Sequence, residues 1–253
     1  MAGHSHSANV KHRKDRVNAL KAKVFSKIAK MVVVAARLGG GDPDSNPRLR
    51  LAIEKARAAS MPKDNIQRAI KKGTGKTDGA NFEELIYEGY ATGGVALIVT
   101  ILTDNRNRTA PEIKKLFERG GGSLGSSGSV AYMFSRKSIF DVEPDEELDE
   151  EKLMDSVIEA GADDFVSENG LVQIHADPGD FLAIKAALEE LGIKLSGAEV
   201  GFVPGNRVDV ESLETARRVV RVLESLEEHD DVQSVFSNHR VSGEIAEELA
   251  KES

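Results

Sequence analysis

The chain has 253 residues, 40% of them hydrophobic, and contains no cysteine. This length allows two or three domains with buried cores, and the lack of cysteine excludes disulfides, thiolate metal sites and a thiol nucleophile. The net charge is −8, but residues 1–80 hold 18 Lys and Arg against 6 Asp and Glu, whereas residues 81–253 hold 16 against 36. Charges of +12 and −20 in the two parts predict a polyanion-binding end and an acidic end that faces solvent or other proteins.

No segment of the sequence is suited to crossing a membrane or to directing export. The most apolar run, MVVVAA at residues 31–36, is much shorter than the ~18 apolar residues that a spanning helix needs. The N-terminus is basic but lacks the apolar core of a signal peptide. We therefore expect a cytoplasmic protein with no membrane partner.

The first third of the chain predicts a basic flexible arm followed by a small helical domain. Residues 1–15 show no apolar period, so we expect a mobile arm there. From residue 16 to residue 38, apolar side chains recur at helical steps of three and four, at Val17, Leu20, Val24, Ile28, Met31 and Ala35. A second helix has Pro47 near its first turn, and a third opens at Pro62. Three short helices predict a helical domain that ends at residue 77.

The stretch GTGKT at residues 73–77 resembles part of a phosphate-binding P-loop. That motif needs another glycine five positions before its Gly-Lys pair, and Ile70 stands there instead. The loop should also follow a buried strand, whereas the residues before it have helical spacing. We interpret Gly73 as the C-cap of the third helix and residues 78–81 as a linker. No nucleotide cofactor is expected.

Strand patterns replace helical ones after the linker. The runs ELIYEGY (84–90) and GVALIVTILT (94–103) are rich in β-forming residues, and ATGG between them is a turn. A helix is expected from Thr109, because TAPE supplies an N-cap and a glutamate three residues later. We interpret SVAYMF at residues 129–134 as another strand.

Residues 137–203 alternate strand, helix, strand, strand, helix and strand, which is the ferredoxin-like order. The helix at 210–229 and the strand at 232–237 complete no unit alone, so we assign them to the sheet that begins at Glu84. The predicted fold is α+β and multidomain, with an N-terminal three-helix domain and two α+β (ferredoxin-like) domains, one inserted in the other. The predicted limits are 1–15 for the basic flexible arm, 16–77 for the helical domain, 82–136 plus 204–240 for the α+β domain, 137–203 for the inserted ferredoxin-like domain and 241–253 for the acidic tail.

The sequence contains no convincing catalytic or metal-binding constellation. GGSLG at 121–125 matches the sequence of a nucleophile elbow, in which a strand precedes the serine and a helix follows it. Here we expect a helix before the motif and a strand after it, which is the reverse order. A Gly/Ser loop that closely approaches a backbone or a phosphate fits better. The arm histidines, His4, His6 and His12, have no fixed geometry for a metal. The acidic run at 141–155 lacks the spacing of a calcium loop. We predict no catalytic residue, no metal and no cofactor.

Cations are concentrated in the arm and the first helix. Residues 11–30 contain eight Lys or Arg and one acid, Asp15. An extended arm of ~15 residues can reach ~50 Å, and its cations, amides and hydroxyls suit phosphate and sugar contacts. A merely solvated basic helix is the alternative. The candidate nucleic-acid-binding residues here are His4, Ser5, Asn9, Lys11, His12, Arg13, Lys14, Arg16, Lys21, Lys23, Lys27 and Lys30.

A second candidate site is TDNRNRT at residues 103–109, just before the helix expected from Thr109. The free amides of a helix N-terminus favour an anion, and alternating Asn and Arg side chains can bind phosphate. The same side chains can instead cap the helix and tie down the chain before it, and both interpretations stay open. The candidate residues are Asn105, Arg106, Asn107 and Arg108.

Six ordered motifs of this chain resemble the YebC family. They are MAGHS with KHRK, LGGGDPDSNPRLR, MPKDNIQRAIKKG, YEGY with GGVALIV, LTDNRNRT, and GSLG with GSVAYMF, and they run from residue 1 to about 240. The resemblance implies a helical N-terminal domain followed by two α+β domains, one inserted in the other. Where the family usually has Lys-Trp after AGHS, this chain has His6 and Ser7.

The resemblance also implies a non-enzymatic function in gene expression. The family is labelled as probable DNA-binding transcriptional regulators, and it includes the mitochondrial translational activator of cytochrome oxidase. Its members are also described as translation factors that bind the ribosome and help at difficult, proline-rich peptide bonds. We expect nucleic acid, either ribosomal RNA or DNA, as the partner. RNA is favoured because no helix shows base-reading spacing of Arg, Asn and Gln. The alternatives are a DNA-binding transcriptional regulator and a protein-interaction scaffold, and a monomer is favoured.

Overall fold

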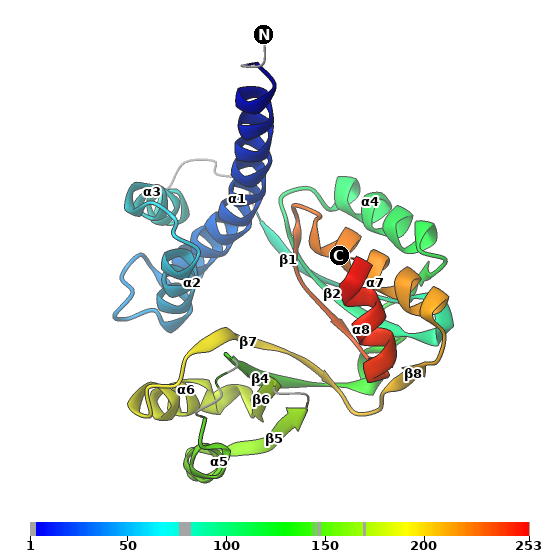
Figure 1. The fold of residues 1–253 in the computed structure, drawn as a ribbon. Helices are drawn as coiled ribbons and strands as arrows, with labels where there is room; N and C mark the ends of the chain where they lie inside the picture. The colour runs from blue at the N-terminus through cyan, green and yellow to red at the C-terminus, as the bar shows by residue number, and fades with distance from the viewer. Residues whose placement is uncertain (1–3, 76–81, 144, 146–147, 169–170, 253) are drawn as a thin grey trace. The chain divides into compact units, whose positions relative to one another are not determined.

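The computed structural model describes residues 4–75, 82–143, 145, 148–168 and 171–252 (Figure 1). The chain forms two compact units. One contains Met1–Tyr87, Val99–Arg119 and Arg221–Val235, and the other contains Glu88–Ile98, Gly120–Val220 and Phe236–Ser253. Among the described residues, no helix is long and apolar enough to cross a membrane.

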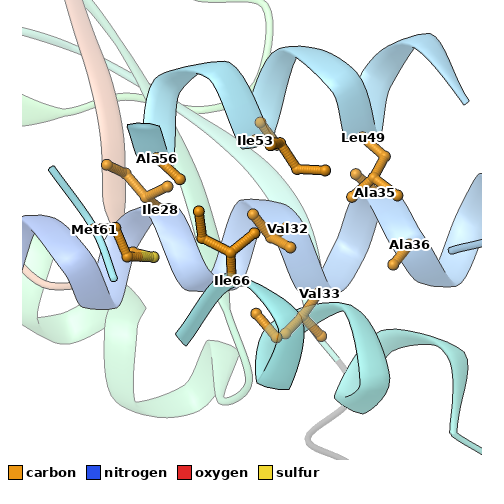
Figure 2. Packing of buried hydrophobic residues seen from close by; sticks show 12 residues of the cluster. Ile28, Val32, Val33, Ala35, Ala36, Leu49, Ile53, Ala56, Met61 and Ile66 are labelled. Carbon is orange, nitrogen blue, oxygen red and sulfur yellow. The ribbon is translucent and has the colours of Figure 1, made fainter. Parts of the chain in front are cut away.

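Three helices form the N-terminal part of the first unit, as the sequence predicts. They are α1 (His4–Gly39), α2 (Pro47–Ala58) and α3 (Lys63–Thr74). Figure 1 shows α2 and α3 beside the second half of α1, and Figure 2 shows the shared core. This core contains Ile28, Val32, Val33, Ala35, Ala36, Leu49, Ile53, Ala56, Met61 and Ile66.

A buried asparagine sets the turn between the first two helices. Asn46 is the N-cap of α2, and its Oδ1 accepts from the amide of Leu49 (3.1 Å). Its Nδ2 donates to the backbone oxygens of Ala35 and Gly40, both at 2.8 Å. One side chain therefore starts α2 and satisfies carbonyls at the end of α1.

The structure differs from the prediction at both ends of this helical region. Residues 4–15, expected in an arm without regular structure, form the first turns of α1, and no Gly or Pro interrupts this stretch. Gly73 is not the C-cap, because α3 continues to Thr74 and Gly75 caps it. A Cβ on Gly73 would lie 2.4 Å from the carbonyl oxygen of Val33, so the glycine permits close packing of α3 on α1. The predicted linker at 78–81 lies outside the described residues.

The first sheet has the strand order β3-β1-β2-β9. Its strands are β1 (Glu83–Tyr90), β2 (Ala96–Thr103), β3 (Ser123–Leu124) and β9 (Val232–Ser237), with a short turn η1 (Thr92–Gly94) before β2. The late strand β9 joins the sheet begun near Glu84, as predicted. Two helices accompany these strands in the sequence, α4 (Arg106–Arg119) and α7 (Leu213–Glu227).

Two predictions in this region are corrected by the structure. Helix α4 begins at Arg106, so Thr109 is not its N-cap; the Asn105 Oδ1 accepts from the amide of Arg108 instead (3.1 Å). Residues 129–134 are not a strand, because they contain the short helix η2 (Ala131–Met133) and the strand begins only at Phe134. The amides of Val130 and Ala131 donate to the Glu88 carboxylate, which removes them from strand pairing.

The second sheet has the order β5-β6-β4-β7, and all its pairs are antiparallel. Its elements are β4 (Phe134–Val142), α5 (Glu150–Glu159), β5 (Ala162–Glu168), β6 (Leu171–Ala176), η3 (Pro178–Asp180), α6 (Phe181–Glu190) and β7 (Leu195–Pro204). This is the predicted ferredoxin-like arrangement. Phe140 of β4 packs on Phe181 at the start of α6, with ring centroids 4.8 Å apart.

The remaining elements of the second unit are short. Strands β8 (Val208–Val210) and β10 (His239–Val241) pair in parallel, and α8 (Gly243–Glu252) follows. In the predicted acidic tail, residues 243–252 form this helix. The residue limits of the five predicted segments remain predictions.

Candidate nucleic-acid interface

The α1 lysines with described side chains differ in their surroundings. Lys21 and Lys23 are exposed. Lys27 is half-buried, and its Nζ donates to the backbone oxygen of Glu227 in the last turn of α7. Burial lowers the pKa of Lys27, while the negative charge of Asp230 acts in the opposite direction. Lys21 and Lys23 therefore present their charge to solvent, whereas Lys27 already has a partner within the chain.

Lys30 also has internal partners. Its Nζ donates to the backbone oxygen of Asp230 (3.0 Å) and to Oδ1 of Asp231 (2.6 Å). The Lys30 side chain is only 16% exposed, and the Asp231 side chain is only 2% exposed. A phosphate that bound Lys30 would have to compete with a carboxylate that is already desolvated.

The other oxygen of Asp231 collects three further donors. Its Oδ2 accepts from Arg108 Nη2 (2.7 Å), Thr109 Oγ1 (2.8 Å) and Thr103 Oγ1 (3.1 Å). Burial acts to raise the pKa of Asp231, but the hydrogen bonds from Lys30, Arg108 and Thr109 outweigh burial and hold this pKa well below its usual range. Asp231 is therefore an ionised, buried acceptor that fixes two of the predicted phosphate-binding cations in place.

The four residues 105–108 have different roles: one caps a helix, one forms ion pairs and two are exposed to solvent. Asn105 caps α4, and Arg108 pairs with Asp231 and, at 3.3 Å, with Asp104. Arg106 and Asn107 are exposed in the first turn of the helix. Of the two interpretations that the sequence left open, capping and internal ion pairing are what the structure shows for Asn105 and Arg108. Arg106 and Asn107 remain candidates for an outside anion.

The other predicted residues lie in the first half of α1, where the structure describes a helical backbone. Along a helix, residues 4–20 extend over about 25 Å at 1.5 Å per residue. These candidates are His4, Ser5, Asn9, Lys11, His12, Arg13, Lys14 and Arg16, and all lie within the helix His4–Gly39.

Two grooves adjoin the basic part of α1. One, of about 610 Å³, surrounds Asp231 and mixes cations with Asp104, Glu112, Glu228 and Asp230, which makes it a poor site for a polyanion. The other, of about 570 Å³, is lined by Phe25, Lys30, Arg68, Lys72 and Phe82 among others, and none of its lining residues is acidic.

Sequence reasoning did not identify Asp231, which lies in the first groove, or Arg68 and Phe82, which line the second. Asp231 lies 201 positions from Lys30, and no local pattern links them. The second groove does have a sequence signal, since Arg68 and Lys72 are one helical turn apart on α3.

No catalytic or metal site is evident in the part of the chain that the structure describes. Those residues contain no group of three or more His, Cys, Asp or Glu side chains that could hold a metal ion. Ser123 lies in the short strand β3 and not at a strand-to-helix turn, so it does not form a nucleophile elbow. The ring of His175 is buried and its Nε2 lies 2.6 Å from Gln173 Oε1, consistent with a structural histidine.

Comparison with known proteins identifies the family. Residues 5–76 match the TACO1/YebC protein N-terminal domain, and residues 82–239 match the TACO1/YebC second and third domain. A "Probable transcriptional regulatory protein" of Halothermothrix orenii is 50% identical over 100% of both chains. One of the same name from Natranaerobius thermophilus is 49% identical over 98% of this chain and 99% of its own. The crystal structure of a conserved hypothetical protein, Aq1575 from Aquifex aeolicus, has a TM-score of 0.82 at 46% identity and covers 89% of this chain and 93% of that one. The chain belongs to the TACO1/YebC family.

Proposed function

We propose that this protein is a non-enzymatic, nucleic-acid-binding regulator of gene expression that acts in translation, through ribosomal RNA. Its role would be to assist difficult peptide bonds such as those of proline-rich segments. The observation that carries this proposal is the basic helical part: residues 1–80 have a net charge of +12, and Lys21 and Lys23 expose their charge on α1. Phosphate contacts of this kind provide affinity without sequence preference.

The form of the basic surface favours RNA over duplex DNA. The exposed cations among the described side chains of α1 are Lys21, Lys23 and Arg37. They are too widely spaced to form an array of Arg, Asn and Gln that could read base edges. Proteins that recognise folded RNA rely on its shape, its phosphates and its unpaired bases. A long basic helix beside an aromatic-lined groove suits such a surface.

A DNA-binding transcriptional regulator is the second candidate, favoured by the names of the Halothermothrix and Natranaerobius relatives. A protein-interaction scaffold is the third, favoured by the net charge of −20 over residues 81–253. In that case the basic helix would be dispensable.

The decisive experiment is sedimentation of the full chain with ribosomes at low and high salt, followed by sequencing of crosslinked nucleic acid. We expect co-sedimentation that is lost at high salt and in a variant with Lys11, Arg13 and Lys14 changed to Ala. The matched control changes Lys114, Lys152 and Lys194 to Ala, because these lysines are exposed and lie outside the basic segment. The control should sediment like the unchanged protein.

Each alternative predicts a different result. Enrichment of discrete promoter DNA with no ribosome association would support the transcriptional role and reject translation. Ribosome binding that persists in the Lys11, Arg13 and Lys14 variant would reject the basic helix as the binding element and favour the scaffold.

A further inference from the structure

The groove of about 570 Å³ runs between one face of α1 and one face of α3. Its lining positions recur at steps of three and four on each helix, so each wall is a single helix face. The wall from α1 contains Ala22, Phe25, Ser26, Ala29, Lys30 and Val33, and the wall from α3 contains Asn65, Arg68, Ala69 and Lys72. Met61 and Phe82 complete the lining.

Small side chains on both walls create the open space. Ala22, Ser26 and Ala29 on α1 and Ala69 on α3 have small side chains that fill little of the space between the two helices. The bottom is apolar where Val33 meets the groove, and Figure 2 shows Val33 and Met61 within the helical core. A groove of this volume is within the range of small-ligand sites and is large enough for one planar ring system.

Two aromatic rings provide surfaces for such a ring system. Phe25 and Phe82 are partly buried against the helical core and also line the groove. The Lys72 Nζ lies 6.0 Å from the centroid of the Phe82 ring, so a cation lies over that ring. Aromatic faces beside cations are the arrangement on which unpaired bases stack in single-stranded nucleic-acid sites.

The charge of the groove selects an anion. Its lining includes Lys30, Arg68 and Lys72 and no acidic side chain. Lys30 is held by Asp231, which leaves Arg68 and Lys72, both exposed, as the cations that can meet a ligand. Arg68 is also oriented, because its Nε donates to the backbone oxygen of Asp64 (3.3 Å) and its Nη2 donates to Asn65 Oδ1.

We propose that this groove binds one unpaired nucleotide of a single-stranded stretch of nucleic acid. The base stacks on Phe82 and Phe25, and its phosphate contacts Arg68 and Lys72. This inference rests on the proposed function and deepens it, because it makes an unpaired segment, rather than a continuous duplex, the feature that the protein recognises. A base paired within a duplex cannot enter a groove between two helices without leaving its stack.

The chain offers a direct probe of this proposal because it contains no tryptophan. The variant Phe82→Trp places a single indole in the groove, and a stacked base quenches indole emission. Titration uses unstructured RNA and DNA strands of about 12 nucleotides, a length within the site size of single-strand binding folds. A duplex of the same sequence is the comparison, and Leu182→Trp, on the exposed side of α6, is the control reporter.

A matched pair of lysines tests the groove without altering its packing. Lys71 and Lys72 are both exposed neighbours on α3, but only Lys72 lines the groove. We expect Lys72→Gln and Arg68→Gln each to weaken single-strand binding by about tenfold, the effect of one charged hydrogen bond. Lys71→Gln should have a clearly smaller effect. Phe82→Leu, which keeps an apolar side chain but no ring, should also cost about tenfold.

The results separate this inference from the proposed function. Saturable quenching of Phe82→Trp but not of Leu182→Trp, together with a larger effect at Lys72 than at Lys71, would support the groove. The relative affinities for RNA and DNA strands would then identify the source of the nucleotide. Binding seen by fluorescence anisotropy of a labelled strand, without quenching or without the Lys72 and Lys71 difference, would overturn the groove site and leave the proposed function standing. Absence of binding to single strands, duplexes and ribosomal RNA at low salt would overturn both.

Discussion

Two buried carboxylates of this protein are stabilised in different ways. Asp231 is 2% exposed and is held by two cationic side chains and two hydroxyls. Glu88 is 5% exposed and is held by backbone amides, with Oε1 accepting from Gly128 (2.7 Å) and Oε2 accepting from Val130 and Ala131 (2.8 Å each). For Glu88, burial acts to raise the pKa, but the three amides outweigh it and leave this pKa below its ordinary value.

The difference shows how burial of a charge can serve two purposes. Asp231 pairs with Lys30 and Arg108 and so joins segments far apart in the sequence. Glu88 uses no cation and instead orders the Gly/Ser loop before β4, a segment whose composition alone predicts a flexible loop. The first carboxylate holds two cations within the fold, and the second shapes the backbone.

The largest effect is expected from Asp231→Asn, which removes the charge that two cations share. Lys30 and Arg108 lose the negative charge that they share, and asparagine leaves one acceptor oxygen where the carboxylate offers two to its four side-chain donors. We expect a loss of about 3 kcal/mol in the free energy of unfolding, at the lower end for breaking a buried pair because Arg108 is 45% exposed and can reach water. Urea unfolding followed by circular dichroism measures it.

The neighbouring acid provides the control for this prediction. Asp230→Ala alters an exposed side chain whose backbone oxygen, and not its carboxylate, accepts from Lys30. A change within about 0.5 kcal/mol is expected. Equal losses for the Asp230 and Asp231 variants would contradict the assignment of Asp231 as the shared acceptor.

A smaller loss is expected from Glu88→Gln, because the donors to Glu88 are backbone amides and no cation loses its counter-charge. The glutamine NH₂ group would face an amide donor, and at least one buried N–H would lose its partner, at a cost of about 2 kcal/mol. Hydrogen exchange should accelerate at the amides of Gly128, Val130 and Ala131. Glu83→Gln, an exposed change on the same strand, should leave exchange in the loop unchanged. Unaltered exchange in the Glu88 variant would mean that the loop is ordered without its carboxylate.

Elements set by local patterns were predicted correctly, and an element that depends on a distant side chain was not. The helix at Pro47, the ferredoxin-like strand order and the return of the strand at 232–237 to the first sheet follow from local patterns, and the structure confirms them. The strand predicted at 129–134 was wrong because Glu88, about 40 residues earlier, binds amides that a strand would use. Such distant partners leave no mark in residue periodicity.

The candidate binding site shows the same limit. Lys21, Lys23 and Lys30 were predicted from local charge density, and Arg108 was predicted from its place before a helix N-terminus. The structure shows Lys21 and Lys23 exposed and Lys30 and Arg108 paired with Asp231. Charge density indicates which part of a chain can meet a polyanion. It does not show which cations the fold itself uses, because that depends on acids brought close only by the tertiary structure.

A comparison of two lysines on one face of α1 tests whether Asp231 withdraws a cation from binding. Lys23 and Lys30 are seven residues apart, which is two helical turns. We expect Lys23→Gln to reduce the salt dependence of nucleic-acid binding by about one phosphate contact, and Lys30→Gln to change it by much less. The measurement is the slope of log affinity against log salt. Equal changes in slope would mean that Lys30 leaves Asp231 when nucleic acid binds.

The smallest effect concerns His175. Burial shifts the pKa of this histidine, and its partners do not reverse the shift. The side chain is 4% exposed, with Nδ1 3.5 Å from Asp164 Oδ2. Burial lowers the pKa of His175 and the charge of Arg207 adds to this, while Asp164 and Asp141 act in the opposite direction without cancelling it. Unlike the two carboxylates, whose hydrogen-bond partners favour the charged form, this imidazole is therefore held in its neutral form.

The sign of the pH dependence follows from that difference. A histidine whose folded pKa lies below its ordinary value of about 6.5 adds stability above that value, and this stability is lost as the pH falls toward the folded pKa. We expect the urea midpoint to decrease from about pH 7 to about pH 5 and to decrease less in His175→Asn. His239, whose pKa is also lowered by burial and by Arg207, should account for part of the remaining decrease. An identical pH dependence in the variant would show that Asp164 compensates the burial of His175, as the cations do for Asp231.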